Sequence, residues 1–161
     1  MAAMMLLGLM SFTACGDDDD ETIDDIIEKI DNGNLKATVK IAGDNPMVLT
    51  AEWKGIATEV HTATFNADES LKSYIIVMTY ANSKLADEEW NGIVEDGKED
   101  PEWFACYSRE GNVLTYDGTK NILEDISEEM DDENQDMTHK QLFKLYFEML
   151  KQEYTSGRQD Y

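Results

Sequence analysis

Residues 35–80 read LKATVKIAGDNPMVLTAEWKGIATEVHTATFNADESLKSYIIVMTY, and this stretch decides the fold. Apolar and polar residues alternate over residues 35–41 and again over residues 47–53, which is the period of a half-buried strand. The sequence Gly-Asp-Asn-Pro between these two segments is typical of a turn, so they are predicted to form a hairpin. Residues 56–65 and 71–80 are rich in β-branched and aromatic side chains and are predicted to be two further strands.

The strand predicted at residues 71–80 is apolar on both faces. One face carries Tyr74, Ile76 and Met78, and the other carries Ile75 and Val77. Such a strand is expected in the interior of a sheet, covered by a helix. Residues 83–93 supply a candidate helix, because Asn82 or Ser83 can cap it and its apolar residues share one face.

The second half of the chain adds a hairpin and two helices. Residues 102–107 and 112–116 flank a turn formed by Arg109, Glu110 and Gly111. One helix is predicted around Ile122, Leu123, Ile126 and Met130. The last is opened by a capping box from Thr138 to Gln141 and is lined by Leu142, Phe143, Tyr146, Phe147, Leu150 and Tyr154. With a short amphipathic helix at residues 22–31, residues 22–161 are predicted to form a single α+β domain. Its antiparallel sheet has about six strands, with the helices segregated from it.

Charge excludes some classes of partner. The chain has 161 residues with 35 acidic and 13 basic ones, a net charge of -22. A protein that grips nucleic acid or an anionic membrane surface needs Lys or Arg to neutralise phosphates, so neither is expected as a direct ligand. Segments 16–31, 87–102 and 117–136 hold nine, eight and nine of the acids with one base each. The predicted strands are close to neutral. Grouped acidic segments would attract divalent cations or a basic partner, whereas separate ones would only keep the protein soluble.

The N-terminal residues have the pattern of a secretory signal. An apolar run over residues 2–10 is too short to span a membrane but has the length of a signal-peptide core. Small residues, Thr13 and Ala14, precede Cys15. An acidic run, Asp17, Asp18, Asp19, Asp20 and Glu21, follows it. The alternative is a buried helix in which Cys15 is a small core residue, but the acidic run leaves its next turn nowhere to be buried.

The stretch from Phe12 to Cys15 resembles a lipobox, and residues 1–21 are similar to the start of surface-exposed lipoproteins of the Bacteroidota. The resemblance implies cleavage after residue 14, attachment of acyl chains such as palmitate at Cys15, and a tether at residues 15–21. It implies that Asp17, Asp18, Asp19 and Asp20 act as an export signal, so that the protein is anchored in the outer membrane and faces the cell exterior. Phe12 departs from the pattern, because an aliphatic residue is usual there. The resemblance implies nothing about activity.

Motifs for catalysis or metal binding are not found in the sequence. His61 and His139 have no second ligand at zinc-site spacing, and Cys106 within an aromatic stretch is expected to be a buried, inert thiol. The acidic loop at residues 132–136 suggests a calcium loop but lacks the required Gly and Glu, so at most weak divalent-cation binding is expected. Trp53, Trp90 and Trp103 are expected to pack in the core rather than to form a sugar-binding platform. No cofactor and no specific metal site are predicted.

These observations favour a membrane-anchored, non-enzymatic module with a binding or accessory role, whose partner is an outer-membrane protein. Two alternatives remain: a small hydrolase that uses acidic residues, and an inhibitory or structural subunit of an outer-membrane complex. A cleft that holds two carboxyls with shifted pKa values would indicate the hydrolase, whereas a flat sheet face with exposed aromatic side chains would indicate binding.

Overall fold

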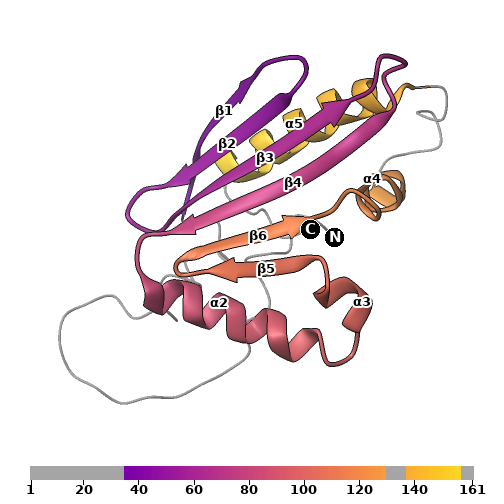
Figure 1. Ribbon diagram of the computed structural model, residues 1–161. Coiled ribbons are helices and arrows are strands. Elements are labelled where there is room, and N and C mark those ends of the chain that lie inside the picture. The colour runs from indigo at the N-terminus through magenta and orange to yellow at the C-terminus, as the bar shows by residue number, and fades with distance from the viewer. Residues whose placement is uncertain (1–34, 130–136, 157–161) are drawn as a thin grey trace.

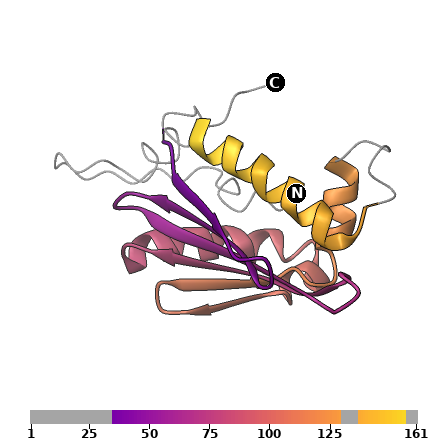
Figure 2. The ribbon, with the colours of Figure 1, turned by 90° about the horizontal axis from the view of Figure 1, so that it is seen from above.

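The computed structural model describes residues 35–129 and 137–156. These residues form an open six-stranded antiparallel sheet with helices packed against one side of it (Figures 1 and 2). The α+β architecture with segregated helices is therefore confirmed. The helix predicted at residues 22–31 lies outside the described residues.

The sheet has the strand order β1-β2-β3-β4-β6-β5. The first four strands form a meander, and the chain then returns as a hairpin in which β6 pairs with β4 and β5 forms the edge. Strand β4 thus lies in the interior of the sheet, as predicted. The strands are β1 (Thr38–Ala42), β2 (Met47–Trp53), β3 (Ala57–Phe65), β4 (Leu71–Tyr80), β5 (Tyr107–Glu110) and β6 (Val113–Asp117).

Helices in the described residues are α2 (Ser83–Asp96), α3 (Pro101–Phe104), α4 (Ile122–Glu129) and α5 (His139–Ser156). The predicted caps of α2 and α5 are confirmed. The backbone N–H of Leu85 donates to Asn82 Oδ1 at 3.0 Å. In the capping box of α5, the N–H of Thr138 donates to Gln141 Oε1 at 2.9 Å, and the N–H of Gln141 donates to Thr138 Oγ1 at 3.3 Å.

Aromatic side chains of α5 form the centre of the core. Phe143 is fully buried, and its ring centroid lies 5.2 Å from that of Tyr74 on β4 and 5.6 Å from that of Phe65 on β3. The predicted helix at residues 83–93 corresponds to α2, which contacts β4 and β6. The rings packed on Tyr74, however, come from α5. This long helix therefore covers much of the meander (Figure 1).

The first strand of the second hairpin begins later than predicted. Residues 101–104 are helical, and β5 starts at Tyr107. Asp100 Oδ1 accepts hydrogen bonds from the backbone N–H groups of Glu102 and Trp103 at 3.1 and 3.0 Å, and Pro101 occupies the first helical turn. A capping Asp followed by Pro favours a helix start, so local capping prevails over strand propensity here.

Candidate functional site

One face of the sheet has no helix of the described residues lying over it (Figure 2). Its side chains are those that alternate with the buried ones along β2, β3, β4 and β6. Most of them are Thr, Ser or β-branched aliphatic residues, and two, Glu52 on β2 and Asp117 on β6, are acidic. This uncovered face consists of Val48, Thr50, Glu52, Thr58, Val60, Thr62, Thr64, Ser73, Ile75, Val77, Thr79, Val113, Thr115 and Asp117.

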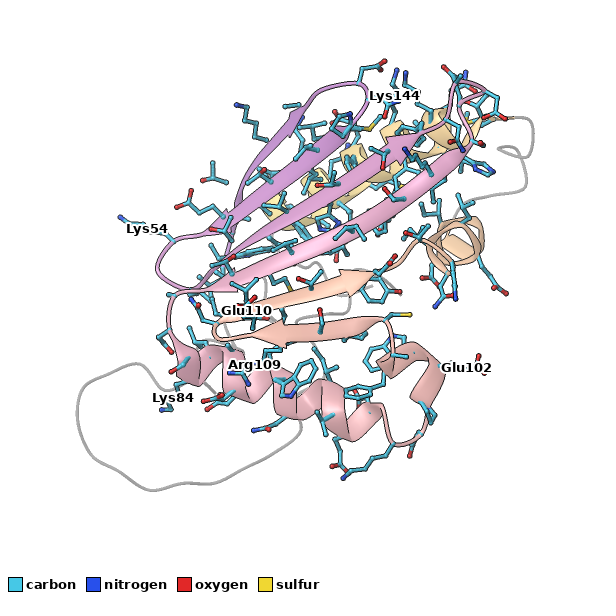
Figure 3. The ribbon with its side chains drawn as sticks, viewed as in Figure 1. Lys54, Lys84, Glu102, Arg109, Glu110 and Lys144 are labelled. Atoms are coloured by element: carbon cyan, nitrogen blue, oxygen red, sulfur yellow. The ribbon has the colours of Figure 1, made fainter. Side chains whose placement is uncertain are left out.

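Register places the aliphatic side chains of the uncovered face together. Val60 lies opposite Val77, and Thr62 lies opposite Ile75, so the apolar side chains meet at the centre of the sheet. Charged side chains also lie on this side of the sheet. Lys40 is on edge strand β1, and Glu110 is on edge strand β5 at the turn of the second hairpin (Figure 3). Glu52 lies at the end of β2 opposite Thr58, and Asp117 lies at the end of β6 opposite Ile75. The aliphatic side chains are therefore flanked by charged ones.

The two sides of β4 differ in how they are covered. Ile75 and Val77 are half-buried, whereas Tyr74, Ile76 and Met78 on the covered side are at most 1% exposed. Because adjacent strands lie only about 5 Å apart, neighbouring side chains shield Ile75 and Val77 without any helix above them. The strand is apolar on both faces, but helices in the described part of the chain cover only one of them.

On the covered face, a polar cluster lies inside the core. It consists of Glu59 and His61 on β3, Tyr74 on β4 and Tyr154 on α5. Glu59 is 3% exposed and His61 is 0% exposed. Glu59 Oε1 contacts His61 Nε2 and accepts a hydrogen bond from the Tyr154 hydroxyl at 2.8 Å. On the other side of the ring, His61 Nδ1 lies 2.5 Å from the Tyr74 hydroxyl.

One placement of the protons satisfies the contacts among Glu59, His61, Tyr74 and Tyr154. The Nε2–H of His61 donates to the carboxylate of Glu59, and Nδ1 accepts from the Tyr74 hydroxyl. Tyr154 donates its proton to the same carboxylate. Burial, followed by the charges of its neighbours, raises the pKa values of Tyr74 and Tyr154, so both phenols stay protonated as donors. The cluster thus links the two central strands to α5.

Glu89 of α2 is a second buried acid near this cluster, and it is 7% exposed. Burial, and next the negative charge of Glu59, raise the pKa of Glu89 from 4.5 to about 8. The side chain is therefore a neutral carboxylic acid at neutral pH. Two carboxyls with unlike environments are one of the two features expected of a hydrolase. The other feature is a cleft, but both carboxyls lie within the core.

The raised pKa of Glu89 makes stability depend on pH. Between 4.5 and about 8 the folded state binds a proton that the unfolded state has lost, so the free energy of unfolding falls as pH rises. The variant Glu89→Gln removes this dependence. We expect its stability relative to the native chain to increase from pH 5 to pH 9 by on the order of a few kcal/mol. Urea unfolding at each pH measures it.

The matched control for this prediction is Glu95→Gln on the same helix, because the Glu95 side chain is 72% exposed. Its pH profile should follow that of the native chain. If Glu89→Gln also follows the native profile, Glu89 is ionised in the folded state at neutral pH and the prediction is wrong.

The residues predicted for anchoring and export, Cys15, Asp17, Asp18, Asp19 and Asp20, lie outside the described residues. The acidic loop at residues 132–136 also lies outside them. In the part of the chain that the structure describes, no group of three or more His, Cys, Asp or Glu side chains is placed to hold a metal ion. Within residues 35–129 and 137–156, no helix is both long enough and apolar enough to cross a membrane.

Cys106 is half-buried rather than buried, which corrects the prediction for this residue. It lies between α3 and β5, at the margin of the core, and its Sγ donates to the carbonyl oxygen of Glu102 at 3.6 Å. Burial, followed by the charge of Asp117, raises the pKa of the Cys106 thiol. A protonated thiol is a poor nucleophile, so this environment fits an inert cysteine.

The remaining candidates of the sequence make structural contacts. His139 Nδ1 accepts a hydrogen bond from the backbone N–H of Leu71 at 3.0 Å, which joins the start of α5 to β4. Trp53 is 4% exposed, and Trp90 and Trp103 are half-buried against the core. Trp90 packs on Phe104 and Trp103 packs on Tyr107, with ring centroids 5.7 and 4.5 Å apart. These tryptophans lie on three different elements and do not form one stacking platform.

The helices of the acidic segments lie on the covered side of the sheet. Helices α2, α3 and α4 belong to segments 87–102 and 117–136, and they pack on that side with α5 (Figure 2). Lys140 and Lys144 of α5 pair with Asp44 in the β1–β2 turn, and Lys144 lies beside that turn in Figure 3. The hydrogen bond from Lys140, followed by that from Lys144, lowers the pKa of Asp44.

Fold and surface together define this chain as an α+β protein with an open antiparallel sheet, one side of which is left free by the described helices. Comparisons with protein-family models, curated proteins and solved structures found no match.

Proposed function

We propose that this chain is a lipoprotein, anchored in the outer membrane through Cys15 and facing the cell exterior. In this proposal it has a non-enzymatic role and contacts another protein through the uncovered face of its sheet. The observation that carries the proposal is the group of adjacent aliphatic side chains, Val60, Ile75 and Val77, on a side of the sheet that the described helices leave free. The anchor rests on the sequence pattern around Cys15 and on the acidic run that follows it.

The chemistry of the uncovered face suits a protein partner with an apolar patch. Its methyl groups, from Val60, Ile75 and Val77 among others, gain free energy when they leave water. Its threonine hydroxyls can donate or accept hydrogen bonds at the rim of such a contact. A small molecule is less suited, because ligand sites for small molecules are concave and enclose most of the ligand. The face of an open sheet instead matches another broad surface.

The buried carboxyls do not favour the hydrolase alternative. Glu59 and Glu89 are only 3% and 7% exposed, and Glu59 is held by His61 and Tyr154. A general acid or base must come within hydrogen-bond distance of its substrate. These contacts support a structural role for the two carboxyls.

Cysteine labelling on whole cells tests the proposed function. In a Cys106→Ser background, Thr62→Cys places a thiol at the centre of the uncovered face, and Thr155→Cys places one on the exposed end of α5 as the matched control. A membrane-impermeant maleimide should label Thr155→Cys at the same rate on cells and in dilute purified protein. It should label Thr62→Cys several-fold more slowly on cells, because a partner covers that face.

Two outcomes would contradict the proposed function. Equal rates for Thr62→Cys on cells and in the dilute protein would mean that nothing binds the uncovered face. Failure of Thr155→Cys to react on intact cells, with labelling after lysis, would mean that the protein does not face the exterior. Adding Cys15→Ser should remove the label from the cells, and its persistence there would rule out the lipid anchor.

A further inference from the structure

We infer that the protein partner of the uncovered face presents an apolar patch flanked by Lys or Arg side chains. This inference rests on the proposed function and specifies the chemistry of the partner. Protein interfaces commonly have an apolar centre and a polar rim. This side of the sheet offers both parts, because its aliphatic side chains lie between charged ones.

The pairing of β3 with β4 sets the apolar centre of the contact. Val60 of β3 lies opposite Val77 of β4, and Ile75 is the next residue along β4 on the same side. All three are half-buried by their neighbours in the sheet. A partner that covers them removes the rest of their apolar area from water, so this group favours a partner with methyl groups or rings at the matching place.

Three acidic residues, Glu52, Glu110 and Asp117, lie around this centre, and all three are exposed. Glu52 and Glu110 belong to one row of paired residues, on β2 and β5, which are four strand spacings or about 19 Å apart. Val113 is the member of that row on β6, and Asp117 lies four residues, or about 13 Å, further along the same strand. The acidic groups therefore flank the aliphatic side chains from more than one direction.

The carboxylates of this rim are available to a partner. Among the ion pairs of the described residues, none joins a Lys or Arg to Glu52, Glu110 or Asp117. Asp117 accepts a hydrogen bond from the backbone N–H of Thr119 at 3.1 Å, which leaves its negative charge in place. Lys40 on edge strand β1 offsets one of the three charges, so this side of the sheet remains acidic.

Charge complementarity selects a basic rim on the partner. A partner that covers the aliphatic centre also takes the nearby carboxylates partly out of water, and cationic groups opposite them offset that cost. The charge of -22 on the whole chain attracts a basic surface at long range and repels an acidic one. A second copy of this chain carries the same acidic residues and is therefore disfavoured as the partner.

Reversal of the rim charges tests the inference in the whole-cell labelling assay. The change Glu52→Lys, Glu110→Lys and Asp117→Lys is combined with Thr62→Cys in the Cys106→Ser background. The labelling rate on cells is divided by the rate for the same variant as dilute purified protein, so that changes in thiol reactivity cancel. Each reversal should weaken binding by roughly two- to tenfold, and the triple change should remove the protection of Thr62→Cys.

Two further sets of variants guard against misfolding and against an effect of net charge alone. Glu52→Gln, Glu110→Gln and Asp117→Asn together introduce no repulsive charge and should remove part of the protection. The matched control is Glu95→Lys, Glu99→Lys and Glu102→Lys, which changes the net charge equally at exposed positions on α2, on α3 and between them. This control should keep full protection. A cooperative urea transition of each purified variant shows that it is folded.

Three results would overturn the inference. Full protection in the triple lysine variant would mean that the partner covers the face without basic residues. Equal loss of protection in the control would mean that net charge, not the rim, attracts the partner. Return of protection when the lysine variant is expressed together with the native chain would identify the partner as a second copy. The proposed function survives each of these results, and it fails if Thr62→Cys is unprotected with the native rim.

Discussion

Replacing Glu59 with alanine is expected to lower the free energy of unfolding by about 2–6 kcal/mol, at about 1–3 kcal/mol for each of two buried donors left without an acceptor. The carboxylate is 3% exposed and accepts from both His61 and Tyr154. Its removal leaves the Nε2–H of His61 and the hydroxyl of Tyr154 buried without their acceptor. Urea unfolding measures the change as a lower midpoint with an unchanged slope.

Two further variants test whether the loss of stability comes from the buried contacts of Glu59 or from the removal of any glutamate from a strand. Glu52→Ala on the neighbouring strand β2 removes an exposed carboxylate and should change stability by no more than about 0.5 kcal/mol. Glu59→Gln keeps an acceptor oxygen and should cost less than Glu59→Ala. If Glu59→Ala is as mild as Glu52→Ala, the carboxylate does not hold the cluster together.

Much of the fold follows from local signals in the sequence. The alternation at residues 47–53 and the turn before it predicted the first hairpin, and the capping box at Thr138 and Gln141 predicted the start of α5. These signals act within a few residues, so a single sequence contains them. The helix at residues 101–104 was missed, although Asp100 followed by Pro101 is a helix-start signal that would have revealed it.

Which face of the sheet is covered could not be predicted. In β3 the covered side carries Ala57, Glu59, His61, Ala63 and Phe65, and the uncovered side carries Thr58, Val60, Thr62 and Thr64. The two sets have similar polarity, because the Glu59–His61 pair lies on the covered side and Val60 lies on the other. Hydrophobic periodicity therefore does not distinguish them. The distinction depends on contacts with Tyr154, which is 95 residues from Glu59 in sequence.

The candidate surface depends on long-range pairing in the same way. Val60 and Val77 meet because β3 pairs with β4. Thr115 joins them because β4 pairs with β6 rather than with β5, the next strand in the sequence. Each of these residues is an ordinary strand residue in its own segment. Only the order of the strands assembles them into one surface. The predictions for Cys15 and the acidic run, in contrast, depend on a contiguous motif and need no folded structure to be stated.

Replacing Phe143 with alanine is expected to lower the free energy of unfolding by about 3–5 kcal/mol, the range for truncating a buried phenylalanine. The side chain is fully buried at the point where α5 meets the centre of the sheet. Its ring contacts four others, with centroids between 5.2 and 6.1 Å, and these belong to Phe65, Tyr74, Tyr146 and Phe147. Truncation leaves a cavity among rings on three elements, which cannot all move to fill it.

A pair of leucine variants on the same helix separates burial from helix propensity. Leu150 is 2% exposed and Leu145 is 40% exposed. Because alanine is a good helix former at either position, Leu150→Ala should cost about 2–5 kcal/mol and Leu145→Ala no more than about 0.5 kcal/mol. Near-ultraviolet circular dichroism should weaken for Phe143→Ala and stay unchanged for Leu145→Ala, since only the former changes the packing of aromatic rings. If Phe143→Ala is as stable as Leu145→Ala, α5 does not pack on β3 and β4 as described, and the side of the sheet left uncovered would have to be assigned again.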